Sequence, residues 1–254
     1  MSPAQIVDYV RHKNWGVVAK PGIVGPDAGP ALLQLLTDKD SQVRQLAVAC
    51  LNAAGGPAAS QGLLHELRDP TETVRAAAAR FLRGHYNPTD LPAIANTMNT
   101  SPDEYIREQL ALLLGESGDA SKIALLTTRL QSEKDEHARR ADSLAAARLG
   151  DPASRSQLVR RLEHDDPAER VAALRDLPYV NDVRLLQHAA PLLDDIRPGL
   201  NVGPSHGPYF IRVCDVAVNI ANQMLGGRFG WAAAIKRYSP QELNEAKSVL
   251  FAIR

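Results

Sequence analysis

The sequence predicts an all-α protein, a right-handed α–α superhelix made of about six stacked helix pairs with a cap at each end. An arginine recurs in a helical context at intervals of 31, 32, 32, 31 and 42 residues. Each interval carries two amphipathic segments with a 3.6-residue period, separated by a short polar turn. A period this regular is typical of stacked repeats rather than of a globule with one centre. The recurring arginines are Arg44, Arg75, Arg107, Arg139, Arg170 and Arg212.

The repeats are predicted in register with these arginines. We expect an N-terminal cap over residues 1–29 and a C-terminal capping helix within 227–254, all in one continuous solenoid domain. The segment "SPQELNEAK" supports the second cap, because Ser239 and Glu242 fit a capping box and Pro240 fits the first helical position. The six predicted repeats cover residues 30–57, 58–87, 88–118, 119–150, 151–181 and 182–226.

The second helix of each repeat places its apolar residues on one face. In the first repeat this face consists of Val43, Leu46, Ala47, Cys50 and Leu51, and we predict that it forms the core. A residue that tolerates the left-handed conformation then ends the helix, and an aspartate follows as N-cap of the next one. The ends are expected at Gly55, Gly118, Gly150 and Asn181, and the N-caps at Asp119, Asp151 and Asp182.

Acidic residues in the turns explain why an arginine recurs within an apolar helix. Asp69 lies six residues before Arg75, and Asp165 and Asp166 lie shortly before Arg170. We expect each guanidinium to pair with carboxylates of its own or a neighbouring turn while its methylene groups pack between helices. The alternative, a row of arginines that binds phosphates, is disfavoured because each arginine has acids nearby.

These repeats resemble a known family. The turn followed by Val-Arg-x-x-Ala, as in "SQVRQLAVACL" and "ETVRAAAARFL", is similar to HEAT repeats, specifically to the short bacterial type of bilin-lyase-like proteins. The resemblance spans about residues 30–226. It implies an arginine–aspartate ladder that ties the repeats together, formed by the six arginines given above. It leaves the activity open, since this scaffold carries many functions.

Composition excludes several classes of partner. Lys+Arg and Asp+Glu both number 29, so the chain has no net charge with which to attract nucleic acid, and we expect no specific nucleic-acid binding. No apolar run approaches about 18 residues, so we expect no membrane partner and a cytoplasmic monomer. A chain that had lost a secretion signal would look the same. Cys50 and Cys214 are expected to be buried and reduced.

No catalytic residue, cofactor or metal is predicted. Asp142 and Asp215 occupy a position where other repeats carry alanine, and we expect each to pair with an arginine of an adjacent repeat; a role as a catalytic or ligand-binding acid is the alternative. His65 and Glu66 resemble the His-Glu motifs of HEAT-type deoxyhypusine hydroxylases, which bind two irons through several such pairs. A single pair does not predict that site.

The sequence predicts a non-enzymatic module that binds a partner protein or peptide, or acts as a scaffold. The alternative is an enzyme or enzyme subunit of the bilin-lyase type, which would need a deep apolar pocket. The insertion at 197–210 is rich in proline and glycine, and is either a contact loop or a lid. The expected contact residues are Gln45, Arg80, Glu108, Arg140 and Arg175 on the exposed side of the second helices, with His206, Tyr209 and Phe210 in the insertion.

Overall fold

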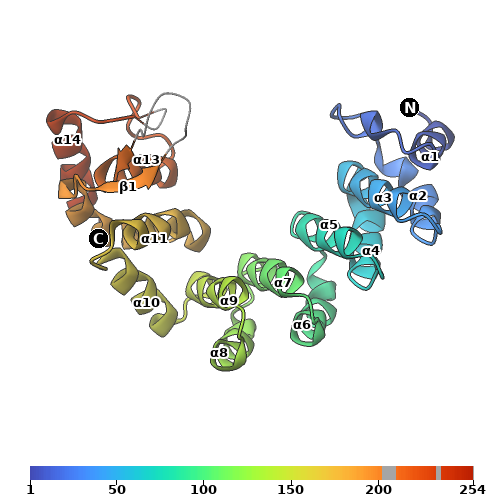
Figure 1. The fold of residues 1–254 in the computed structure, drawn as a ribbon, viewed down its shortest axis with the longest axis horizontal. Helices are drawn as coiled ribbons and strands as arrows, with labels where there is room; N and C mark the ends of the chain where they lie inside the picture. Colours follow the sequence, from blue (N-terminus) through green and yellow to red (C-terminus); the bar gives the residue numbers. More distant parts are fainter. Residues whose placement is uncertain (202–209, 233–235, 254) are drawn as a thin grey trace. The chain divides into compact units, whose positions relative to one another are not determined.

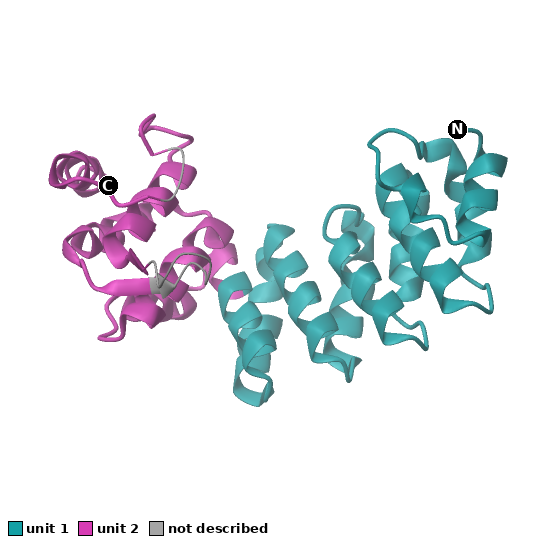
Figure 2. Ribbon diagram, turned by 45° about the horizontal axis from the view of Figure 1, so that its top comes forward, with its two compact units in different colours: residues 1–145 teal, residues 146–254 magenta. Residues whose placement is uncertain are grey.

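The fold is an all-α solenoid of helix pairs in this computed structural model, which confirms the predicted class (Figure 1). The structure describes residues 1–201, 210–232 and 236–253. Contacts between residues divide the chain into two compact units, Met1–Ala145 and Ala146–Arg254, coloured separately in Figure 2. The sequence predicted one continuous domain, because the helical pattern of the segment that joins the units is uninterrupted.

The first unit contains the first eight α-helices and most of the ninth. Short 3-10 turns, η1 (Trp15–Val17), η2 (Pro26–Ala28), η3 (Pro88–Asp90) and η4 (Ala120–Lys122), lead into several of them. The helices are α1 (Pro3–Arg11), α2 (Gly29–Leu35), α3 (Ser41–Ala54), α4 (Gly56–Glu66), α5 (Glu72–Leu82), α6 (Leu91–Thr100), α7 (Glu104–Glu116), α8 (Ile123–Ser132) and α9 (Glu136–Leu149).

Two layers of helices make up this unit. The second helices of successive repeats, α3, α5 and α7, pack side by side, and the first helices α2 and α4 pack against each other in the other layer (Figure 1). The core lies between the layers. The predicted face of α3 is buried there, from Val43 to Leu51. The layers approach closely at Gly62 of α4, where a Cβ atom would lie 2.6 Å from Cδ1 of Leu51.

The predicted helix ends and caps are confirmed. Gly118 and Asn181 adopt positive φ angles of 72° and 57°, a conformation that commonly ends a helix and that glycine and asparagine tolerate. The aspartates that follow these ends accept a backbone N–H two or three residues later, which satisfies a donor that the helix leaves free. These N-caps are Asp119 (from Ser121), Asp151 (from Ser154) and Asp182 (from Arg184).

The second unit contains the later helices and a small hairpin. Strands β1 (Pro198–Asn201) and β2 (Phe210–Arg212) pair antiparallel, with Asn201 opposite Phe210 and an irregularity between Pro198 and Leu200. The ends of the predicted loop at 197–210 are thus strands; residues 202–209 lie outside the described residues. The helices are α10 (Pro152–Leu162), α11 (Pro167–Val180), α12 (Leu186–Ala189), α13 (Val213–Met224) and α14 (Pro240–Phe251), with 3-10 turns η5 (Val183–Leu185) and η6 (Ala190–Asp194).

Helix α14 begins as predicted. The Ser239 hydroxyl accepts the N–H of Glu242, and the Glu242 carboxylate accepts the N–H of Ser239. The chain before this helix is held by Asn222 of α13, whose amide accepts the N–H of Phe229 at 2.7 Å and donates to the carbonyl of Ala232 at 3.1 Å. The C-terminal cap therefore combines a helix with an irregular segment fixed by side-chain hydrogen bonds.

Candidate functional site

The recurring arginines form rungs between consecutive turns. Nη1 of Arg44 on α3 donates to the backbone carbonyls of Asp38 (2.8 Å) and Lys39 (3.3 Å) in its own turn. Its Nε and Nη2 donate to the two oxygens of Asp69 in the next turn, at 2.6 and 2.9 Å. One guanidinium thus binds two turns at once, and only the second of them supplies a carboxylate.

The same geometry recurs at Arg107 of α7. It donates to the carbonyls of Ser101 (3.1 Å) and Pro102 (2.9 Å) in its own turn and, through Nε and Nη2, to both oxygens of Glu133 at 2.8 and 2.9 Å. The rung of Arg75 on α5 is weaker. It donates to two carbonyls of its own turn and to Asp103 of the next turn at 3.3 Å.

The acidic residue that precedes each second helix does not pair with the arginine of that helix, because its carboxylate caps the start of the helix. Asp40 accepts the N–H of Gln42, and Asp103 accepts the N–H of Ile106 while its other oxygen receives Arg75. Of the two locations that the sequence left open, the carboxylate partner is the one in the following turn.

The remaining rungs are less regular. In the second unit Arg170 donates to Asp195 of the next turn at 2.8 Å, and Arg212, the last residue of β2, pairs with Asp215 in the first turn of α13. Arg139 of α9 is exposed, and its side chain makes no hydrogen bond or ion pair with the described residues. Arg139 thus occupies the same repeat position as Arg107, but its side chain is exposed and does not join two turns.

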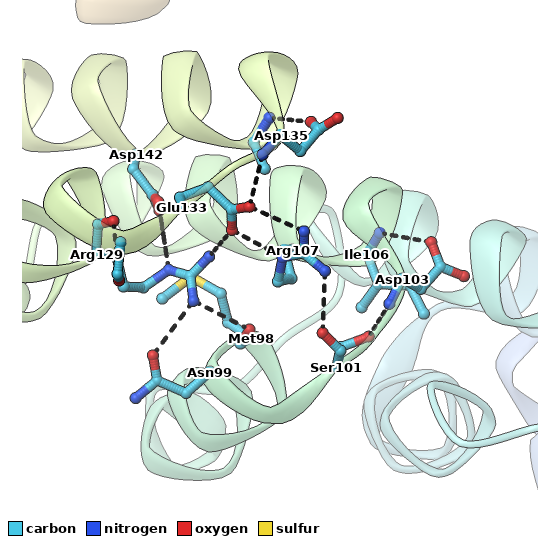
Figure 3. A network of polar contacts seen from close by, with 12 residues as sticks. Met98, Asn99, Ser101, Asp103, Ile106, Arg107, Arg129, Glu133, Asp135 and Asp142 are labelled. Carbon is cyan, nitrogen blue, oxygen red and sulfur yellow. Dashed lines mark hydrogen bonds and ion pairs between the residues drawn. The ribbon is translucent and has the colours of Figure 1, made fainter.

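The buried acids Asp142 and Asp215 pair within their own repeats, which corrects the expectation of a partner from an adjacent repeat. Asp142 lies 3.3 Å from Nε of Arg129, on the first helix of the same pair (Figure 3). Burial raises the pKa of Asp142 to about 7, although Arg129 opposes this. Asp215 accepts from Arg212 three residues earlier and from the N–H of Tyr238. Arg129 reaches Asp142 from the facing helix of the same pair, and Arg212 reaches Asp215 from three residues earlier in the chain.

A third buried acid, Glu66, was named from the sequence only as part of a His-Glu pair, and its burial was not expected. Glu66 of α4 is 1% exposed, and His65 Nδ1 lies 2.7 Å from its Oε1. Burial raises the pKa of Glu66 to about 7. Aligning the repeats reveals it, because equivalent positions carry Leu35, Met98 and Leu130. The same alignment reveals Asp176, which pairs with Arg161 at 2.6 Å where other repeats carry apolar residues.

No metal centre is evident in this region. Among the described residues there is no group of three His, Cys, Asp or Glu side chains placed to hold a metal ion. Two cavities, of about 470 and 420 Å³, flank the end of α4 and share Leu64, His65 and Arg68. Most of the residues that line them are polar or charged, whereas a bilin-lyase activity would need a deep apolar pocket.

The expected contact residues are accessible where the structure describes them. Gln45 and Glu108 are partly exposed on α3 and α7, and Arg80 is exposed on α5 between them, with its guanidinium 4.7 Å from the ring of Phe81. Since α3, α5 and α7 are packed neighbours, these three belong to one face of the first unit. We call the surface formed by Gln45, Arg80 and Glu108 the α3–α5–α7 face.

The other expected contacts lie on other elements or outside the described residues. Arg140 is exposed on α9 and Arg175 is exposed on α11 of the second unit. Phe210 is 37% exposed at the start of β2. His206 and Tyr209 lie outside the described residues.

Comparisons with known proteins agree with this fold. A sequence profile described as HEAT repeats matches residues 8–83, 60–145 and 91–178. Among solved structures, the complex of CpcE and CpcF of phycocyanin lyase from Nostoc sp. PCC7120 is 18% identical, with a TM-score of 0.58 over 98% of this chain and 95% of the other.

Human deoxyhypusine hydroxylase in complex with glycerol is 14% identical, with a TM-score of 0.42 over 90% of this chain and 96% of the other. No curated protein sequence matches the chain. No described helix is long and apolar enough to cross a membrane. The three profile matches together cover most of the chain, and the protein accordingly belongs to the HEAT-repeat family.

Proposed function

We propose that this protein is a non-enzymatic module that binds a partner protein or peptide on the exposed sides of its second helices, and first of all on the α3–α5–α7 face. The observation that carries the proposal is a division among the polar side chains of these helices. Arg44 and Arg107 are occupied by turn carbonyls and carboxylates, whereas Arg80 and Glu108 of the same layer project from it.

The composition of the α3–α5–α7 face suits a protein rather than a polyanion. Its charges are of both signs, and small or apolar residues, Ala49, Ala76 and Leu112, are partly exposed between them. An arginine beside apolar surface is a frequent anchor in protein interfaces, and mixed charges set the orientation of a partner. A nucleic acid would instead require a row of unpaired cations.

A solved structure with a similar fold also supports a protein as the partner. The CpcE and CpcF structure, which resembles this chain in fold, is a complex of two proteins. On the second unit, Arg175 and Phe210 are the accessible candidates for further contact, and His206 and Tyr209 remain candidates by sequence. A scaffold role belongs to the same class of function.

Site-specific crosslinking tests the proposal. A photoreactive amino acid is placed singly at Gln45, Arg80 or Glu108 in the native cells, with Gln61, exposed on α4 of the other layer, as the matched control position. We expect one and the same protein to be crosslinked at the three face positions and not at Gln61.

Binding of the purified candidate is then measured with charge-reversed variants of Arg80 and Glu108. Crosslinking at Gln61 alone would contradict the proposed surface. A saturable visible absorption band on exposure to a bilin, with no protein partner, would favour the enzyme alternative.

A further inference from the structure

Two buried carboxyl groups in the first unit have no role in the proposed function. Glu66 and Asp142 are 1% and 0% exposed. One oxygen of each, Oε2 of Glu66 and Oδ2 of Asp142, has no hydrogen-bond partner among the described residues, although Oδ2 of Asp142 lies 3.3 Å from Nε of Arg129 in an ion pair. A buried carboxylate with an unsatisfied oxygen is costly, because neither water nor protein replaces its lost solvation. Protonation is the simplest way in which the folded protein avoids that cost.

Glu66 lies beside the rung formed by Arg44 and Asp69. The cavity of about 470 Å³ at the end of α4 is lined by Glu66, by both rung residues and by Asp38. Arg44, from α3, is the cation that faces this group, and Asp69 already binds it through both oxygens. His65 is the other neighbour on α4, and its ring is on the exposed side. A charge on Glu66 would therefore lie next to Asp69, and besides Arg44 the basic side chains around it are His65 and Arg68, both on the exposed side.

Asp142 lies beside the rung formed by Arg107 and Glu133 (Figure 3). Its ion-pair partner is Arg129 of α8, at 3.3 Å, and Nη2 of Arg129 donates to Glu133 Oε2 at 2.6 Å. Glu133 also accepts both hydrogen bonds from Arg107. A charge on Asp142 would thus compete with Glu133 for Arg129.

The two sites share one arrangement. Each of the two rungs with a bidentate carboxylate in this unit has a buried carboxyl group next to its acid. The weaker rung, Arg75 to Asp103, has the apolar Met98 at the position equivalent to Glu66. Two extra acids placed beside the two strongest rungs indicate a property of the ladder rather than two isolated substitutions.

We propose that Glu66 and Asp142 each hold a proton in the folded protein, and that loss of these protons loosens the rungs of Arg44 and Arg107. Contact between successive repeats of the first unit then responds to pH. The inference concerns the ladder, and it stands whether or not the α3–α5–α7 face binds a partner.

The direction of the pH effect follows from linkage. Burial raises the pKa of Glu66 from 4.5 and that of Asp142 from 3.8, both to about 7. An acid with a higher pKa in the folded than in the unfolded chain takes up a proton on folding, so stability falls as pH rises between the two values and is level above about 7. Between pH 5 and 8 the equilibrium constant for unfolding should therefore rise at each site.

Nuclear magnetic resonance tests this on the full chain. The side-chain carboxyl carbons of Glu66 and Asp142 are titrated between pH 4 and 9, and exchange of the Nε–H groups of Arg44 and Arg107 is followed as protection relative to free arginine. We expect carboxyl midpoints near pH 7. Protection of both arginines should fall at least tenfold between pH 6 and 8.

Variants separate a proton-linked role from a merely structural one. Glu66→Gln mimics the protonated acid and should keep Arg44 protected at pH 8, and Asp142→Asn should do the same for Arg107. Glu116→Gln is the control, since Glu116 accepts from Arg83 Nε at 3.1 Å away from these rungs. Carboxyl midpoints below pH 5 would overturn the proposal. So would the same arginine protection in wild type and variants throughout the pH range, or a loss that is equal at every pH.

Discussion

Replacing Arg107 with alanine should destabilise the protein far more than the same replacement at Arg139. The side chain of Arg107 is 14% exposed and that of its partner Glu133 is 5% exposed. The Arg107→Ala variant loses two charge-assisted hydrogen bonds to Glu133 and two to the carbonyls of Ser101 and Pro102. Breaking a buried ion pair costs about 3–5 kcal/mol, and because Arg129 still pairs with Glu133 we expect the lower value, about 3 kcal/mol.

Arg139 is the matched control, because it occupies the same repeat position with an exposed side chain. Its replacement should change the free energy of unfolding by no more than about 0.5 kcal/mol. Urea unfolding followed by circular dichroism gives both values, and hydrogen exchange in α7 assigns the loss to the first unit. Equal destabilisation by the two variants, or less than about 1 kcal/mol for Arg107→Ala, would refute the view that the rungs join the repeats.

Three further predictions concern other parts of the chain. Hydrogen bonds from Arg107 lower the pKa of Glu133 to about 2, so the ionised Glu133 stabilises the fold above pH 4.5 and this stabilisation is lost as pH falls towards 2. Urea midpoints should therefore decrease as pH is lowered from 5 to 2.5, and midpoints that do not change would contradict this. Asp215→Ala should cost about 3 kcal/mol, because it leaves Arg212 and the N–H of Tyr238 without their acceptor, and limited proteolysis should then cleave earlier before α14. Gel-shift titration at low salt should detect no tight nucleic-acid complex, because the arginines of the rungs are already paired with acids. Tight binding with a steep salt dependence would contradict this, since it would show cations available to neutralise phosphates.

The helices and their ends could be predicted because they depend on local sequence. A 3.6-residue apolar period identifies α3, and the residue pair Asn181 and Asp182 identifies the end of one helix and the start of the next without knowledge of the neighbours. The arginine ladder was visible for the same reason, since each arginine and each turn acid recurs in register.

Partners that depend on stacking could not be predicted. Whether Asp69 binds Arg44 or Arg75 depends on the distance between consecutive turns, which no single repeat encodes. The pairing of Asp142 with Arg129 depends on which face of α8 meets α9. The β hairpin likewise depends on packing: a Cβ at Gly199 would lie 2.5 Å from Cγ2 of Val171, so the strand fits against α11 only with glycine there.

The single continuous domain expected from the sequence stays a prediction, and the sequence shows no boundary between the two compact units. The boundary at Ala145 and Ala146 lies inside α9, whose apolar pattern continues without a break. A boundary of this kind depends on how many contacts cross it, and a helix can continue through it.

The central claim is that the rungs hold the repeats together while the α3–α5–α7 face binds a protein. It is tested most directly by measuring the affinity of a crosslinked partner for a double variant of that face, together with the variant's thermal midpoint. Arg80→Glu combined with Glu108→Lys reverses both charges of that face and leaves every rung intact. The account predicts a Kd at least tenfold weaker by calorimetry, with an unchanged thermal midpoint. An unchanged Kd in a folded double variant would contradict it.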